Sequence, residues 1–187
     1  MNSVSAVFLD RDGVINRRTP DRYISRVEEF ELLPGVQEAL ALLRKRSGRL
    51  LVVTNQAGIG KGLMDERDLE AIHAHLRMLA QATGNVVFDA IYYCPHIREA
   101  QCDCRKPATG MGRRASEAFA DIVFEKSWMV GDSLSDLQFG RSLGMRVAHI
   151  RGKDDEQEAI KTFKPDAAFD SLLDFALWLN AQSDELS

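Results

Sequence analysis

The chain has 187 residues, of which 45% are hydrophobic and 28% charged, as in soluble globular proteins. Its net charge of -4 argues against a general nucleic-acid binder, and no apolar run reaches the ~20 residues that cross a membrane. The first residues carry no recognisable secretory signal, and three cysteines cannot all pair, so a reducing cytoplasm is expected. We expect a single domain over residues 1–187 that is a monomer.

Apolar strand-like runs alternate with helical patterns along the chain. In order we expect a strand at 6–9, a helix at 35–46, a strand at 50–54, a helix at 65–82, a strand at 90–93, a helix at 111–119, a strand at 127–130, a helix at 133–143, a strand at 146–150, a strand at 167–169 and a helix at 171–180. This alternation predicts an α/β fold, a doubly wound, Rossmann-like parallel sheet with helices on both faces. Ligands of such sheets bind beyond the carboxyl ends of the strands.

Polar clusters follow four of the predicted strands. They are Asp10 with Asp12, then Thr54-Asn55-Gln56, then Cys94-Pro95-His96, and finally Gly131-Asp132. Because the carboxyl ends of parallel strands meet at one edge, we expect these clusters to converge there.

The first cluster suggests phosphoryl transfer. Asp10 is the candidate nucleophile, since a carboxylate can attack phosphorus and form an aspartyl-phosphate. Asp12 is the candidate acid and base that protonates the leaving oxygen and then activates water. The side chains of Asp10 and Asp132, with the backbone carbonyl of Asp12, are expected to hold Mg²⁺, which prefers oxygen ligands.

Other residues supply donors and positive charge. Thr54 and Asn55 offer a hydroxyl, an amide and backbone N–H groups to the phosphoryl oxygens. Lys106 supplies the cation that the transition state requires. Asp136, four residues after Asp132, is expected to orient a metal-bound water or Lys106.

Each of these residues also has a plain structural interpretation. Asp10 to Gly13 could be a solvated acidic turn, and Thr54-Asn55 another turn. Lys106 could be a surface lysine, and Asp132 a helix N-cap. Taken together these interpretations fail, because they do not explain the order Asp-x-Asp, Thr-Asn, Lys, Gly-Asp-x-x-x-Asp at successive strand ends.

This order resembles the haloacid dehalogenase (HAD) superfamily of phosphohydrolases. The matching stretches are Phe8-Leu9-Asp10-Arg11-Asp12-Gly13, Val53-Thr54-Asn55-Gln56, Arg105-Lys106-Pro107 and Val130-Gly131-Asp132-Ser133-Leu134-Ser135-Asp136. The second aspartate, Asp12, points to phosphate-ester chemistry, since dehalogenating relatives lack that acid. The resemblance implies a HAD-like fold.

All three cysteines fall in one short loop. Cys94 and His96 form one pair and Cys102 and Cys104 a second, which together provide four ligands for tetrahedral Zn²⁺. The alternative is three free cysteines and a surface histidine, but the clustering of every cysteine favours a structural zinc site. The remaining histidines, His73, His75 and His149, are expected to be surface or packing residues.

The zinc loop stands directly before Arg105 and Lys106, so it is expected to fix these cations over the phosphate pocket. The distance in sequence from Asp12 to Thr54 leaves little room for an inserted cap. The segment from Thr54 to Lys106 holds one helix, one strand and the loop. We therefore expect an essentially capless, open site.

The combination resembles the HAD branch that contains the heptose bisphosphate and histidinol-phosphate phosphatases. Thr54-Asn55-Gln56-Ala57-Gly58-Ile59, Ile91-Tyr92-Tyr93-Cys94-Pro95-His96 and Cys102-Asp103-Cys104-Arg105-Lys106-Pro107 carry this likeness. It implies substrate contacts in the stretch 17–21, with Arg17, Arg18 and Arg105 available for a second phosphate. The expected substrate-binding residues are Arg11, Arg18, Thr54, Asn55, Gln56, Ala57, Arg105 and Lys106.

Three departures from that branch affect substrate recognition. The His96–Cys102 spacing is short, Ser133 stands where the branch often has lysine, and the segment 18–23 is slightly longer. The leading hypothesis is a Mg²⁺-dependent phosphatase that removes the 7-phosphate of a heptose 1,7-bisphosphate. The alternatives are a histidinol-phosphate phosphatase, a nucleic-acid 3′-phosphatase, and a phosphate-binding module without activity.

Overall fold

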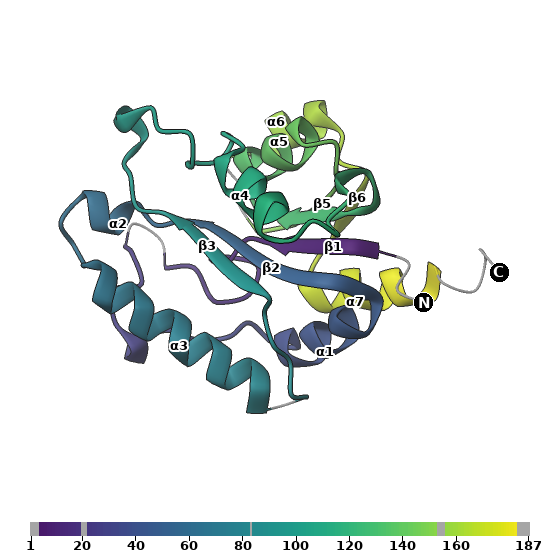
Figure 1. Cartoon of the computed structure of the whole chain (residues 1–187), viewed down its shortest axis with the longest axis horizontal. Helices are drawn as coiled ribbons and strands as arrows, with labels where there is room; N and C mark the ends of the chain where they lie inside the picture. The colour runs from purple at the N-terminus through teal and green to yellow at the C-terminus, as the bar shows by residue number, and fades with distance from the viewer. Residues whose placement is uncertain (1–3, 20–21, 83, 153–155, 183–187) are drawn as a thin grey trace.

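The computed structural model describes residues 4–19, 22–82, 84–152 and 156–182 (Figure 1). Their centre is a six-stranded sheet in the order β3-β2-β1-β4-β5-β6, in which every neighbouring pair is parallel. The strands are β1 (Val4–Leu9), β2 (Ser47–Asn55), β3 (Ala90–Cys94), β4 (Trp128–Gly131), β5 (Arg146–Ile150) and β6 (Ala167–Phe169). The predicted α/β, doubly wound sheet is confirmed.

Helices cover both faces of this sheet. They are α1 (Val36–Arg46), α2 (Ala57–Gly60), α3 (Glu66–Ala82), α4 (Gly110–Ala118), α5 (Leu134–Ser142), α6 (Gln157–Phe163) and α7 (Leu172–Ala181), with short 3₁₀ turns η1 (Val27–Glu29), η2 (Arg98–Ala100) and η3 (Phe124–Lys126). Figure 1 shows α1, α3 and α7 on one side of the sheet and α4, α5 and α6 on the other.

The strands are hydrophobic on both faces because each face packs against a helical layer. In β1, Val7 and Leu9 join the cluster that contains α1, α3 and α7. Ala6 and Phe8 point the other way, into the cluster with α4, α5 and α6. All four side chains are fully buried, which accounts for the uninterrupted apolar run in the sequence.

Polar caps fix where two of the helices begin. The Asp65 carboxylate accepts hydrogen bonds from the backbone N–H groups of Arg67 and Asp68, at 2.8 and 3.0 Å, so Asp65 caps α3 as predicted. Ser133, rather than Asp132, caps α5, and with Asp136 it forms a reciprocal capping box. Asp132 does not cap the helix; its Oδ2 lies 3.7 Å from Arg18 Nη1.

Two helices were not predicted. α2 has only four residues, and α6 buries only Ile160 among its seven residues, so neither carries a clear apolar stripe. Within the described residues, the segments between Asp12 and Thr54 and between Thr54 and Lys106 form elements of the main fold and build no separate cap. None of the described helices combines the length and apolarity needed to cross a membrane.

Candidate active site

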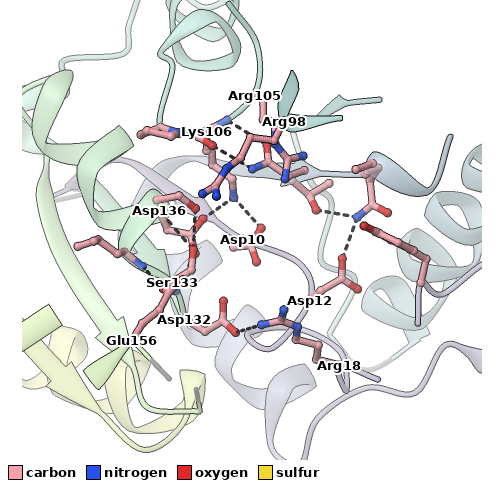
Figure 2. A pocket seen from close by; sticks show the side chains of 18 of the residues that line it. Asp10, Asp12, Arg18, Arg98, Arg105, Lys106, Asp132, Ser133, Asp136 and Glu156 are labelled. Atoms are coloured by element: carbon pink, nitrogen blue, oxygen red, sulfur yellow. Dashed lines mark hydrogen bonds and ion pairs between the residues drawn. The ribbon is translucent and has the colours of Figure 1, made fainter. Parts of the chain in front are cut away.

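Three of the four polar clusters converge on an open pocket of about 690 Å³ at the carboxyl edge of the sheet (Figure 2). The fourth, Cys94-Pro95-His96 at the end of β3, does not line this pocket, so the predicted convergence holds only in part. The walls of the pocket come from the ends of β1, β2 and β4, together with the loop that carries Lys106. The predicted residues that line it are Asp10, Asp12, Arg18, Thr54, Asn55, Gln56, Ala57, Arg105, Lys106, Asp132 and Asp136.

Lys106 is the central cation of the pocket. Its Nζ donates to Asp10 Oδ1 at 2.6 Å and to the Val53 carbonyl at 2.6 Å, and lies 2.7 Å from Asp136 Oδ1. The side chain is 1% exposed. Burial opposes its charge, but Asp10 and Asp136 outweigh this penalty and raise the pKa of Lys106, so it remains protonated.

Three carboxylates crowd around this lysine. Ligand atoms of Asp10, Asp132 and Asp136 all lie within 4.8 Å of one another. Burial, with repulsion from Asp136 and Asp12, raises the pKa of Asp10 to about 7 although Lys106 opposes the shift. Burial and the two neighbouring carboxylates raise the pKa of Asp132 to about 8.

The local charge fits a divalent cation. Lys106 and the partly exposed Arg18 face three buried carboxylates, and burial, together with repulsion between these carboxylates, still raises the pKa values of Asp10 and Asp132. Asp136 is already occupied, because its Oδ2 accepts from the Ser133 N–H at 3.0 Å and from the Ser133 hydroxyl at 2.7 Å. Asp10 and Asp132 are therefore the carboxylates that suit a hard, oxygen-seeking ion such as Mg²⁺.

Glycine is required where the β1 loop passes Asp132. Gly13 has a φ of +93°, and a side chain there would overlap the Asp132 carboxylate. At Gly131, whose φ is not positive, a side chain would overlap the Asp136 side chain. The two glycines leave the space that the side chains of Asp132 on the end of β4 and Asp136 on α5 occupy.

Asp12 is fixed by donors from three side chains. Its carboxylate accepts from Arg11 Nη2 at 3.0 Å to each oxygen, from Asn16 Nδ2 at 3.0 Å and from Gln56 Nε2 at 2.8 Å. Burial favours the neutral acid, but the Arg11 charge and these hydrogen bonds prevail and lower the pKa of Asp12. Asn16 was not predicted from the sequence, since nothing local marks its contact with Asp12.

Arg11, an expected substrate contact, and Arg17, which was available for a second phosphate, both lie outside the pocket lining. The Arg11 side chain is fully buried and bonds to Asp12 and His73, so it lies behind the pocket instead of lining it. Arg17 pairs with Glu31 at 3.1 Å on the surface, outside the pocket. Of the predicted contact stretch 17–21, residues 20 and 21 lie outside the described part of the chain.

The Thr-Asn-Gln cluster positions other groups. Asn55 and Lys106 exchange two hydrogen bonds: the Lys106 N–H donates to Asn55 Oδ1 at 3.0 Å, and Asn55 Nδ2 donates to the Lys106 carbonyl at 3.2 Å. Gln56 Nε2 donates to Thr54 Oγ1 and to Asp12, both at 2.8 Å. The side-chain amide predicted to bind phosphoryl oxygens thus holds the Lys106 backbone in place.

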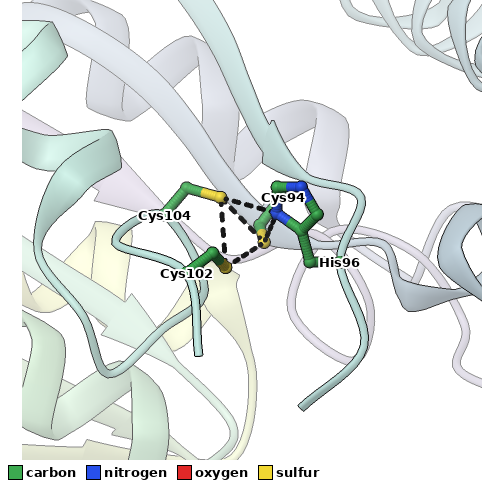
Figure 3. Close-up of side chains that lie close together, drawn as sticks. All are labelled: Cys94, His96, Cys102 and Cys104. Carbon is green, nitrogen blue, oxygen red and sulfur yellow. Dashed lines mark hydrogen bonds between the residues drawn. The ribbon is translucent and has the colours of Figure 1, made fainter. Parts of the chain in front are cut away.

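The four predicted zinc ligands lie together (Figure 3). Cys104 Sγ is 3.0 Å from Cys94 Sγ and 3.5 Å from Cys102 Sγ, and His96 Nδ1 is 3.3 Å from Cys104 Sγ. A tetrahedral site with Zn–S bonds of about 2.3 Å has S···S separations of about 3.8 Å, so the cluster is somewhat tighter than a metal-bound site and needs only a small expansion to hold the ion. The donor set and its compact shape therefore fit Zn²⁺.

The loop that carries the Cys/His cluster, residues 94–104, also contacts the pocket. Arg105 Nη1 donates to the carbonyl of His96 at 3.2 Å, which ties a pocket cation to a cluster residue. The Gly60 N–H donates to the Pro95 carbonyl at 2.9 Å and links the loop to α2. The loop is thus joined to both walls of the pocket.

Further cations line the pocket rim. Arg22, Lys61 and Arg98 were not singled out in the sequence, yet all three line the pocket with Arg18 and Arg105. Figure 2 shows Arg98 beside Arg105 and across the pocket from Arg18. The position of Arg98 inside the zinc loop was the one sequence signal that could have marked it.

Known proteins resemble this chain in sequence and in fold. The HAD-hydrolase-like family model matches residues 103–175. The D-glycero-alpha-D-manno-heptose-1,7-bisphosphate 7-phosphatase of Mycobacterium tuberculosis H37Rv is 41% identical, over 91% of this chain and 89% of its own. The D-glycero-beta-D-manno-heptose-1,7-bisphosphate 7-phosphatase of Pseudomonas putida is 44% identical, over 78% of this chain and 81% of its own.

A solved structure extends the likeness to three dimensions. The D,D-heptose 1,7-bisphosphate phosphatase from B. bronchiseptica, complexed with magnesium and phosphate, superposes with a TM-score of 0.86 at 31% identity. The match covers 96% of this chain and 99% of that one. The chain is a HAD-type phosphoric monoester hydrolase and belongs to the family of the heptose-1,7-bisphosphate 7-phosphatases.

Proposed function

We propose that this protein is a Mg²⁺-dependent phosphatase that hydrolyses the 7-phosphate of a D-glycero-D-manno-heptose 1,7-bisphosphate through an aspartyl-phosphate on Asp10. The observation that carries the proposal is the pairing of Asp10 with buried Lys106 in a pocket that also presents Asp12. The named activity of relatives at 41% and 44% identity supports the substrate.

In the first step, Asp10 attacks the phosphorus. Lys106 engages Oδ1, so the other carboxylate oxygen is the candidate nucleophile. The bond between phosphorus and the sugar C7 oxygen breaks, and Asp12 transfers a proton to the departing oxygen. Asp12 is ionised in the free protein, and an anionic phosphoryl group beside it favours its protonated form.

In the second step, Asp12 acts as a base. It accepts a proton from water, whose oxygen attacks the phosphorus of the aspartyl-phosphate and releases inorganic phosphate and free Asp10. Lys106, bonded to both Asp10 and Asp136, stabilises negative charge in both steps. Mg²⁺ bound by Asp10, Asp132 and the Asp12 carbonyl would reduce the repulsion between the nucleophile and the phosphoryl group.

The rim cations favour a substrate with a second phosphate. Arg98 is exposed and carries a charge beyond the one that Lys106 supplies at the reaction centre. A sugar with phosphates at both ends can place one at Asp10 and the other against this rim. A phosphate ester with one phosphate and a cationic amine lacks the anion that these residues would bind.

Arg98→Ser is expected to lower kcat/KM for the heptose bisphosphate about tenfold, because a hydrogen bond between charged groups is lost. The same change should leave kcat/KM for p-nitrophenyl phosphate within about twofold of the wild-type value, since that substrate has no second phosphate. Arg113→Ser, an exposed arginine on α4 outside the pocket, is the matched control. Equal loss on both substrates would contradict a distal phosphate contact.

Cys94→Ser is expected to remove stoichiometric zinc and to lower the free energy of unfolding by at least about 2 kcal/mol, because metal binding contributes to folding of this loop. Activity should fall too, since the His96 carbonyl that holds Arg105 moves with the cluster. Elemental analysis and thermal unfolding of the purified protein measure both effects. His75→Gln, outside the cluster, should keep its zinc; zinc-free wild-type protein would refute the site.

The substrate is tested by comparing kcat/KM for both anomers of the heptose bisphosphate, histidinol phosphate and a 3′-phosphorylated oligonucleotide. The proposal expects one heptose anomer to be preferred over the last two by at least about 100-fold. A preference for histidinol phosphate would replace the proposed substrate.

A single domain over residues 1–187, a monomeric state and a cytoplasmic location remain parts of the proposal.

A further inference from the structure

Arg11 occupies an unusual place for a charged side chain. It is fully buried, with its guanidinium carbon 5.9 Å from the centre of the Phe30 ring. Burial of a charge is costly unless the charge is paired, and here two side chains accept hydrogen bonds from the guanidinium. Nη2 lies 3.0 Å from both Asp12 oxygens, and Nη1 lies 3.2 Å from His73 Nε2.

His73 anchors this arginine to α3. A guanidinium only donates, so Nε2 of His73 must be the acceptor and the ring proton sits on Nδ1. Burial, with the Arg11 charge, lowers the pKa of His73 to about 3, so the ring stays neutral and keeps this lone pair. The ring also packs near Tyr93, with centroids 6.0 Å apart. His73 on α3, Arg11 and Asp12 are thus linked by consecutive hydrogen bonds.

Two further side chains donate hydrogen bonds to the Asp12 carboxylate. Asn16 Nδ2 approaches Oδ1 from the β1 loop, and Gln56 Nε2 approaches Oδ2 from the end of β2. Arg11 reaches both oxygens from behind. Donors from three directions leave the carboxylate little freedom to rotate, and proton transfer depends on such alignment.

We propose that Arg11, anchored by His73, is a positioning residue that aims the Asp12 carboxyl group at the leaving oxygen. This role rests on the proposed acid and base function of Asp12. Arg11 does not line the pocket, and the pocket residue to which its side chain bonds is Asp12. The charge of Arg11 is not sufficient by itself: its position, set by His73, is required.

The dependence of kcat/KM on the leaving group distinguishes misalignment of the Asp12 carboxyl group from a general loss of stability. The sugar C7 oxygen is a poor leaving group that needs a proton, whereas p-nitrophenolate departs without one. The value of kcat/KM covers steps only up to departure of the leaving group. The ratio of kcat/KM for the two substrates therefore reports protonation by Asp12, and the folded fraction cancels because one preparation is used for both.

Two variants keep the positive charge while disturbing its position. His73→Phe keeps a ring but removes the acceptor, and Arg11→Lys keeps a cation but loses the fork that reaches both partners. Each is expected to lower kcat/KM for the heptose bisphosphate at least about tenfold, and that for p-nitrophenyl phosphate by less than about threefold. His73→Gln restores an acceptor and should keep the ratio near the wild-type value.

Two controls complete the experiment. Ile72→Ala perturbs the buried face of the same helix without removing a polar group, so it should lower the melting temperature and leave the ratio unchanged. Asp12→Ala should shift the ratio most. If Asp12→Ala shifts the ratio but His73→Phe and Arg11→Lys do not, the positioning role is overturned. If Asp12→Ala itself leaves the ratio unchanged, the acid role in the proposed function fails instead.

Discussion

Asp10→Asn is expected to reduce kcat by about 10⁴-fold or more, because an amide cannot form the aspartyl-phosphate. The protein should remain folded. Burial raises the pKa of Asp10 to about 7, so its ionised form is held at a cost that the amide avoids. Lys106 keeps its contact with Asp136 in the variant. The melting temperature should therefore equal or exceed that of the wild type.

The control for this change is Asp170→Asn, which removes an exposed carboxylate paired with Arg151 on the surface. It should leave both kcat and the melting temperature close to the wild-type values. Steady-state rates and thermal unfolding of the three proteins give the comparison. Retention of wild-type hydrolysis by Asp10→Asn would refute the assignment of the nucleophile.

Lys106→Met should damage both activity and folding. The change leaves Asp10 and Asp136 buried without their shared cation, and it removes the donor to the Val53 carbonyl. Breaking a buried ion pair in this way costs about 3–5 kcal/mol. Loss of the cation that stabilises the transition state should lower kcat by about 10²–10⁴-fold. Chemical denaturation and steady-state rates measure the two effects.

The stability effect has a pH dependence with a defined sign. Burial already raises the pKa of Asp10, and Lys106 opposes that shift. Without Lys106, Asp10 holds its proton more tightly in the folded than in the unfolded state, so the variant loses stability as pH rises and regains it as pH falls. Lys126→Met, an exposed lysine in η3, is the matched control and should change neither quantity. If Lys106→Met were as stable and active as Lys126→Met, the central role of this lysine would be wrong.

The main residues of the site could be predicted because the topology of the parallel sheet brings them together. Asp10 and Asp132 each directly follow a buried strand, and Thr54 lies at the end of another. Parallel strands bring such ends to one edge, so residues far apart in sequence meet without any information about side-chain contacts. The cluster of Cys94, His96, Cys102 and Cys104 was predictable for a different reason, since all four residues fall in one short loop.

The contacts behind the pocket could not be predicted in this way. Arg11 stands between two pocket residues, and its sequence position suggested a substrate contact. Its actual partner His73 lies 62 residues away on α3. Which way a side chain at a strand end turns depends on the groups packed behind it, and no local pattern encodes that pairing. The same is true of the contact between Asn16 and Asp12.

The missed helix α6 has a simpler cause. It buries only Ile160, and the residues before it are charged, so the periodic apolar signal is absent. Its neighbour Glu156 nevertheless reaches the site, where its carboxylate accepts from the Leu134 N–H at 2.7 Å at the start of α5. Tertiary packing, and not local propensity, accounts for this element.

The central claim is that Asp10 forms a covalent intermediate, and stereochemistry at phosphorus tests it most directly. A substrate whose 7-phosphate is replaced by a phosphorothioate made chiral with two oxygen isotopes is hydrolysed in water enriched in the third isotope, and the configuration of the released thiophosphate is determined. Attack by Asp10 followed by attack by water is two in-line displacements, so retention of configuration is predicted. Inversion would mean that water attacks the substrate directly, and would contradict the account.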